Sequence, residues 1–197
     1  MIKEKIGNNV FIPMPVCIVG AICTGKENYM TVGWITRANA KPPMIVICIG
    51  KTHLTWKGIT ENEEFSVNFP TAKDLAKTDY IGIISGAKED KSHLYTAYYG
   101  ILKKAPLIEE CPLSFECKLA EKVDLPTNTL FVGEIVAAYA DKEYINKNDF
   151  NYEKAGTYFL TMRDNTYWSF GKKIGTAWKD GMAFKSMTLA ENKGSEG

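Results

Sequence analysis

Residues 15–70 read PVCIVGAICTGKENYMTVGWITRANAKPPMIVICIGKTHLTWKGITENEEFSVNFP, and this stretch decides the fold. It contains three apolar segments rich in β-branched residues, interrupted by the polar turn Thr24–Asn28 and by a Pro-Pro pair, a pattern typical of strands. In Val16–Cys23 both alternating sets of positions are apolar, so we expect that strand to be covered on both faces. An amphipathic helix over Thr52–Glu63, with Thr52 as its N-cap, and a strand over Phe65–Phe69 complete the stretch.

The second of these apolar segments, Tyr29–Arg37, is predicted to be one continuous strand. On that interpretation Met30, Val32, Trp34 and Thr36 share one face, because side chains alternate along a strand. Met44 to Gly50 forms the next strand, which is almost wholly apolar.

The rest of the chain continues the mixture of strands and short helices. Thr71 and Asp74 form a capping-box pattern that predicts a helix to Tyr80, and residues 85–98 are expected to begin as a loop and become helical. Alternating apolar residues predict a strand on each side of the turn Asp124–Asn128, and a last strand follows at Tyr158–Met162.

We therefore predict a mainly β fold in which six or more mostly antiparallel strands close into a barrel flanked by two to four helices. A chain of 197 residues suggests a single domain over residues 1–197. Residues 1–14 are expected to be a lead-in, and residues 190–197 a disordered polar tail.

Composition excludes several classes of function. Hydrophobic residues make up 45% of the chain, charged residues 24%, and the net charge of +1 gives no reason to expect nucleic acid or an anionic membrane as a partner. Neither a signal peptide nor an apolar run of about 20 residues is present, so we expect a cytoplasmic protein.

The five cysteines have no metal-ligand spacing and are predicted to be buried, reduced thiols. With His53 and His93 as the only histidines, we expect neither a metal site nor a Ser-His-Asp site.

Polar side chains gather near the ends of two of the predicted strands. Trp34 and Thr36 lie near the end of the second strand, and Lys51, Thr52 and His53 follow the third. An aromatic ring beside hydroxyls and a lysine suits a ligand that carries a flat ring and a phosphate. Each residue also has a simpler interpretation: a core tryptophan, strand and cap threonines, a solvated lysine, and a histidine that merely occupies the first helical turn.

The order of motifs along the chain is similar to the flavin reductase-like family of FMN-binding split barrels, and within it to the flavoredoxin branch. The motifs are Asn28-x-Met30-Thr31, Trp34, Lys41-Pro42-Pro43 and Gly50-Lys51-Thr52-His53-x-Thr55. The resemblance continues through Glu64–Asn68, Ser85-Gly86 with Asp90-Lys91, and Val132–Val136.

This resemblance implies a split β-barrel that binds FMN, with the phosphate near the end of the third strand and the following helix. It also implies a homodimer with the flavin near the subunit interface. The residues expected to contact the cofactor are Asn28, Thr31, Trp34, Thr36, Lys51, Thr52, His53, Thr55, Ser85, Lys91, Tyr139 and Trp168.

Three of these assignments carry alternatives. The family often places a lysine after a Ser-Gly loop, near the flavin N1 and C2 carbonyl, and Lys88 competes with Lys91 for that place. Tyr139 stands where relatives often carry a histidine, and its phenol can still donate a hydrogen bond. Trp168, with its aromatic neighbours, either stacks on the flavin of a neighbouring subunit or packs as core.

The implied function is transfer of electrons or hydride through bound FMN, with NAD(P)H or a redox protein as the partner. No Gly-x-Gly-x-x-Gly motif follows a predicted strand, so any nicotinamide is expected to dock transiently. Two alternatives remain: a non-enzymatic FMN carrier or sensor that acts only with protein partners, and a split barrel that binds another cofactor such as haem.

Overall fold

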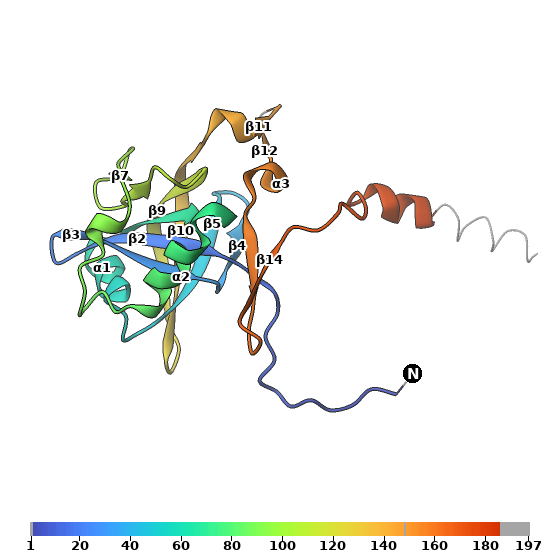
Figure 1. Ribbon diagram of the computed structural model, residues 1–197, viewed down its shortest axis with the longest axis horizontal. Helices are drawn as coiled ribbons and strands as arrows, with labels where there is room; N and C mark the ends of the chain where they lie inside the picture. Colours follow the sequence, from blue (N-terminus) through green and yellow to red (C-terminus); the bar gives the residue numbers. More distant parts are fainter. Residues whose placement is uncertain (1, 148, 186–197) are drawn as a thin grey trace, which may run out of the picture.

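The computed structural model describes residues 2–147 and 149–185, so the tail expected at residues 190–197 lies outside the described residues. Its centre is a seven-stranded antiparallel sheet in the order β3-β2-β6-β9-β10-β5-β4 (Figure 1). The strands are β2 (Cys17–Cys23), β3 (Lys26–Val32), β4 (Ile35–Asn39), β5 (Met44–Gly50), β6 (Glu64–Phe69), β9 (Leu113–Asp124) and β10 (Asn128–Ala140). The fold is therefore mainly β, as the alternating pattern predicts.

The sheet does not close into the barrel that we expected. Strands β3 and β4 are consecutive in the chain, yet they form the two edges of the sheet, and no ladder joins them among residues 2–147 and 149–185. The predicted continuous strand Tyr29–Arg37 is also wrong, because it breaks at Gly33 and Trp34. A Cβ at Gly33 would lie 3.3 Å from the Met14 Cβ, so close tertiary packing accompanies the break.

Strand β2 is buried at every position, which confirms the prediction that it is covered on both faces. Cys17, Val19 and Ala21 belong to the larger core cluster, whereas Ile18 belongs to a second cluster on the opposite face. Helix α1 (Leu54–Asn62) packs against β2 so closely that a Cβ at Gly58 would lie 2.4 Å from the Cys23 Sγ. Strand β2 therefore fixes the position of α1.

The helices begin later than predicted. The N-cap of α1 is His53 rather than Thr52, and its side chain makes no capping hydrogen bond. Before α2 (Leu75–Ile83) comes a 3₁₀ turn, η1 (Ala72–Asp74), in which the Thr71 hydroxyl accepts from the Lys73 N–H. The expected capping box is therefore incomplete, since the Asp74 side chain makes no capping hydrogen bond.

No α-helix forms within residues 85–98, contrary to expectation. This segment contains only the 3₁₀ turn η2 (Ser92–Leu94) and the short strand β7 (Ala97–Tyr98). The Asp90 carboxylate accepts from the Ser92 amide at 2.9 Å, and the Lys91 side chain points into the protein, so the chain is held in turns. Tyr95 is buried in an extended conformation and ends η2.

A smaller three-stranded sheet lies beside the main one and contains β1 (Met14–Pro15), β13 (Tyr158–Thr161) and β14 (Thr166–Ser169). Other elements are β8 (Leu107–Ile108), which pairs with β7, the pair β11 (Ile145–Asn146) and β12 (Asp149–Phe150), η3 (Lys142–Tyr144) and α3 (Tyr152–Ala155). Residues 179–185 are also helical. After β14 the chain runs away from both sheets (Figure 1). No helix in the described ranges is long and apolar enough to cross a membrane.

Candidate functional site

Two adjacent cavities lie where β3, β5 and the first turn of α1 meet. The first is polar, has a volume of about 220 Å³, and is lined by Asn28, Met30, residues 52–55, residues 82–86 and Lys91. The second is more apolar, has a volume of about 180 Å³, and is lined by residues 30–34, Cys48, Gly50, His53 and Asn128. Met30 and His53 line both, so we treat the two cavities as one candidate site.

The N-terminus of α1 gives this site its electrostatic character. The amides of Leu54 and Thr55 have no acceptor in the part of the chain that the structure describes, and the first turn contains no acidic residue. The His53 Nδ1 lies 3.0 Å from the Gly50 carbonyl oxygen, which only accepts, so Nδ1 carries a hydrogen and Nε2 remains for a ligand. Free amides and the positive end of a helix dipole favour an anion here.

A buried hydrogen bond connects β3 to α1 behind the cavities. The Asn28 Nδ2 donates to the Thr55 Oγ1 at 2.8 Å, and both residues are almost wholly buried. The loop after α2 presses on the same pair, because a Cβ at Gly86 would lie 2.2 Å from the Asn28 Oδ1. Glycine at position 86 therefore lets the loop that carries Ser85 form one wall of the polar cavity.

Lys91 places a buried cation on the wall of the polar cavity. Its side chain is buried, and its Nζ donates to the carbonyl oxygens of Ile81 at 2.8 Å and Tyr29 at 3.2 Å. Burial lowers the pKa of this ammonium group, because the charged form loses hydration. Two of its three N–H donors are used, which leaves one for a ligand. The competing Lys88 is exposed and lines a neighbouring cavity instead.

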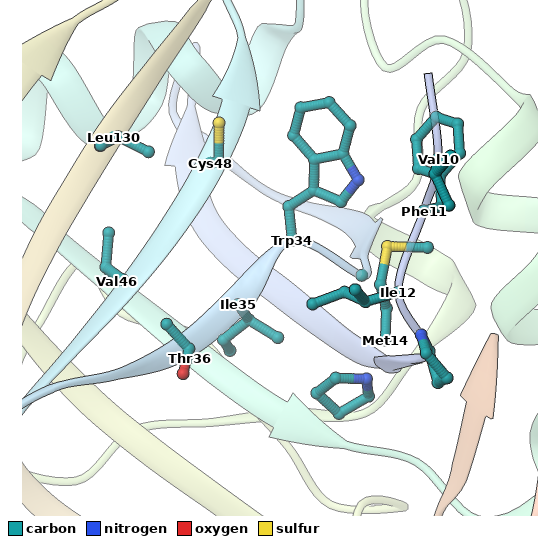
Figure 2. Close-up of a pocket in the computed structure, with 13 residues that line it drawn as sticks. Val10, Phe11, Ile12, Met14, Trp34, Ile35, Thr36, Val46, Cys48 and Leu130 are labelled. Carbon is teal, nitrogen blue, oxygen red and sulfur yellow. The ribbon is translucent and has the colours of Figure 1, made fainter. Parts of the chain in front are cut away.

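Trp34 stands at the boundary between the second cavity and a larger apolar groove (Figure 2). It follows the end of β3, is 47% exposed, and its ring centroid lies 6.5 Å from that of Phe11. Thr31 lines the same cavity, but its hydroxyl donates to the Thr78 carbonyl. Thr36, on β4, lines the groove and neither cavity.

Three other predicted residues lie apart from this site. The Lys51 Nζ is 3.7 Å from the Asp124 carboxylate and lines neither cavity. The Tyr139 hydroxyl donates to the Glu116 Oε2 at 3.0 Å, in a different pocket. Trp168, on β14, is 54% exposed, and its Nε1 donates to the Thr161 Oγ1.

The structure also adds lining residues that were not among the expected cofactor contacts. They are Met30, Val32, Gly33, Cys48, Gly50, Leu54, Gly86, Asn128 and the segment Gly82–Ile84. Asn128 lines the apolar cavity because it lies opposite Gly50 in the pairing between β10 and β5. No local sequence pattern reveals this, because the two paired residues are 78 positions apart in the chain. For Cys48 and Gly82–Ile84 no local pattern marks a site.

No group of three or more His, Cys, Asp or Glu side chains that would hold a metal ion occurs within the described ranges. All five cysteines are free thiols, and burial raises the pKa of Cys23 to about 11. The site therefore offers a helix N-terminus, a buried cation and an aromatic wall, without a nucleophile paired to a base.

The family model described as "Flavin reductase like domain" matches residues 10–160. The chain belongs to this family. Its structure resembles that of flavoredoxin from Methanosarcina acetivorans with a TM-score of 0.92 and 48% sequence identity, over 93% of this chain and 100% of that one.

Flavoredoxin of Desulfovibrio vulgaris (Miyazaki F) is similar with a TM-score of 0.84 and 26% identity, over 92% of this chain and 100% of that one. A curated relative, FMN reductase (NADH) RutF from Bradyrhizobium diazoefficiens, is 24% identical over 96 residues, which are 49% of this chain and 52% of that protein. The fold is that of the FMN-binding split barrels, mainly β with flanking helices.

Proposed function

We propose that this chain binds FMN in the two contiguous cavities and transfers electrons or hydride through it, as a flavoprotein of the flavoredoxin type. The proposal rests on one feature of the structure, which is that three kinds of binding surface lie side by side. An aromatic and apolar wall at Trp34 and Met30 lies beside the free N-terminus of α1 and the buried cation of Lys91.

These residues fit the chemistry of FMN. A phosphate suits the amides of Leu54 and Thr55, and Thr52 also lines this cavity. A flat ring suits the apolar side formed by Met30 and Trp34. Together the cavities, of about 220 and 180 Å³, fall within the roughly 300–1,000 Å³ typical of small-molecule sites.

FMN, when bound, supplies the hydride and electron chemistry. The residues of the chain bind the FMN, orient it and adjust its reduction potential. The Lys91 ammonium group is fixed by two backbone carbonyls, so its charge stays on the cavity wall. A fixed cation there stabilises negative charge on a reduced ligand and raises its reduction potential.

The chain needs an electron donor from outside, and two kinds of partner could supply the electrons. Either NAD(P)H docks transiently or a redox protein exchanges electrons with the cofactor, because the sequence contains no dinucleotide-binding Gly-x-Gly-x-x-Gly motif. We also propose a homodimer, since the half-exposed Trp34 opens onto an apolar groove. Five free thiols suit a reducing compartment, and we propose the cytoplasm.

An absorption spectrum of the purified protein, followed by anaerobic titration with NADH and NADPH, tests this proposal. Flavin bands that bleach with either nucleotide support an FMN oxidoreductase. Flavin bands that bleach only with a reduced protein donor identify an electron carrier instead. A haem spectrum, or no affinity for added FMN, would contradict the proposal.

A further inference from the structure

An apolar groove lies beside the candidate site (Figure 2). It has a volume of about 610 Å³; residues 10–15 form one side, and residues 33–36, Val46, Cys48 and Leu130 form the other. Figure 2 shows the indole of Trp34 between Cys48 and the segment that carries Val10 and Phe11. Gly33, Trp34 and Cys48 line both the groove and the apolar cavity, so whatever fills the groove also covers one side of the candidate site.

A second feature is the segment of residues 171–185, which we call the C-terminal arm. It leaves β14 and runs away from both sheets (Figure 1). Two of its large apolar side chains are almost fully exposed: Ile174 by 101% and Trp178 by 89%. Exposed apolar residues gathered in one segment mark an interaction surface.

Local hydrogen bonds give the arm its own shape. The Asp180 Oδ2 accepts from the Thr176 amide at 2.8 Å, and the Asp180 amide donates to the Thr176 carbonyl at 3.1 Å. These hydrogen bonds within the arm hold the turn that carries Trp178. An ordered segment loses less conformational entropy when it binds.

The arm and the rest of the chain carry opposite charges. Residues 171–185 contain four lysines and one aspartate, a net charge of +3. Of the balancing charge, residues 186–197 carry −1 and residues 1–170 carry −1. The residues that line the groove have no charged side chains, so apolar contact rather than charge is what would hold the arm there.

We propose that the C-terminal arm of one copy of this chain occupies the apolar groove of a second copy, where Ile174 and Trp178 cover Trp34. Mutual exchange of two arms into two grooves gives a closed, symmetric dimer. It removes the exposed apolar surface of the arm and of the groove together. The bound arm closes the Trp34 side of the cofactor site. Its expected effect on flavin binding therefore rests on the proposed function.

Site-specific photo-crosslinking tests the arrangement directly. Two copies with different affinity tags are co-expressed, and only one carries the photoreactive residue p-benzoylphenylalanine in place of Trp178. We expect a crosslink between the two tagged copies that maps to residues 10–15, 33–36 or 46–48. The same probe in place of Ile101, which is 65% exposed on a different part of the surface, is the control and is expected to give no such crosslink.

A crosslink within one copy, a crosslink to another surface, or a yield no higher than that of the control would overturn the exchange. The double variant Ile174→Ser/Trp178→Ser adds a second readout, for which we expect FMN to bind at least threefold more weakly. Unchanged FMN affinity in that variant would overturn the claim that the arm covers the site. Groove crosslinks in a protein that binds no FMN would instead refute the proposed function and leave the arm exchange standing.

Discussion

At the scale of single residues, Trp34 matters most because its exposure argues against a core role. Its indole is 47% exposed, lies beside Phe11, and borders both the apolar cavity and the groove. Large aromatic side chains contribute most to stability when they are fully buried, so half of the possible benefit is absent here. A ligand or a partner surface recovers the rest.

We expect Trp34→Ala to weaken FMN binding roughly 3- to 10-fold, because an aromatic contact contributes about 0.5–1.5 kcal/mol beyond its buried area. The melting temperature of the apo-protein is expected to change little. Fluorescence titration and thermal unfolding of the same variant measure the two effects. Tyr152→Ala is a matched control, since Tyr152 is 46% exposed and lines neither cavity. Unchanged affinity with a large loss of apo-protein stability would make Trp34 a core residue.

Sequence reasoning identified much of the candidate site but not the reasons for its geometry. Asn28, Thr52, His53, Thr55 and Ser85 line the polar cavity, and their contact with FMN stays a prediction. Only the structure shows that Lys91 lines the polar cavity and Lys88 does not, because the two carbonyls that hold Lys91 belong to residues 62 and 10 positions away. Contacts between distant backbone groups leave no local pattern in a sequence.

At the scale of elements, the position of α1 relative to β2 controls the anion-binding end of the site. Helix α1 approaches β2 through Gly58, and its first turn carries the free amides. The strands β2, β5 and β6 could be predicted because their apolar residues are continuous or alternate within a few positions. The break between β3 and β4 could not, because it coincides with the packing of Gly33 against Met14.

Gly58→Ala tests this packing. Alanine normally stabilises a helix by up to about 1 kcal/mol relative to glycine. Here the new Cβ would lie 2.4 Å from the Cys23 Sγ and 2.6 Å from the Ile22 carbonyl oxygen. We therefore expect a net loss of about 1–3 kcal/mol in the free energy of unfolding, together with weaker FMN binding.

Urea denaturation measures the change in stability. The control is Gly181→Ala, at a helical glycine with no atom within 4 Å of the added Cβ, where we expect no loss. Equal stability of the two variants would show that α1 does not depend on close contact with β2.

At the scale of the whole molecule, buried acidic groups make stability depend on pH in the alkaline range. Burial raises the pKa of Cys23 to about 11 and of Tyr158 to about 12, and it raises the pKa values of Cys17, Cys111 and Cys117 as well. In the unfolded chain a thiol ionises near pH 9. Above that pH the unfolded state has lost protons that the folded state keeps, so stability falls as pH rises.

Between pH 8 and pH 10 we expect each of these thiols to lower the free energy of unfolding by about 1.4 kcal/mol. Lys91 acts in the opposite direction, because its lowered pKa makes the folded state more favourable as pH rises toward 10.5. The combined effect of four thiols on the free energy of unfolding is larger than the opposite effect of one lysine. Urea midpoints at several pH values measure the net slope, and Cys23→Ala is expected to reduce it by about one thiol's share. A stability that stays flat from pH 8 to pH 10 would contradict this account.

We propose above all that a flavin phosphate binds at the N-terminus of α1, within a site walled by Trp34 and Lys91. Parallel titrations of the apo-protein with FMN and with riboflavin test it most directly, since the two ligands differ only in the phosphate. Charge-assisted contacts of about 1.5–3 kcal/mol each predict that FMN binds at least tenfold more tightly, with one FMN per chain. Equal affinity for the two flavins would contradict the claim.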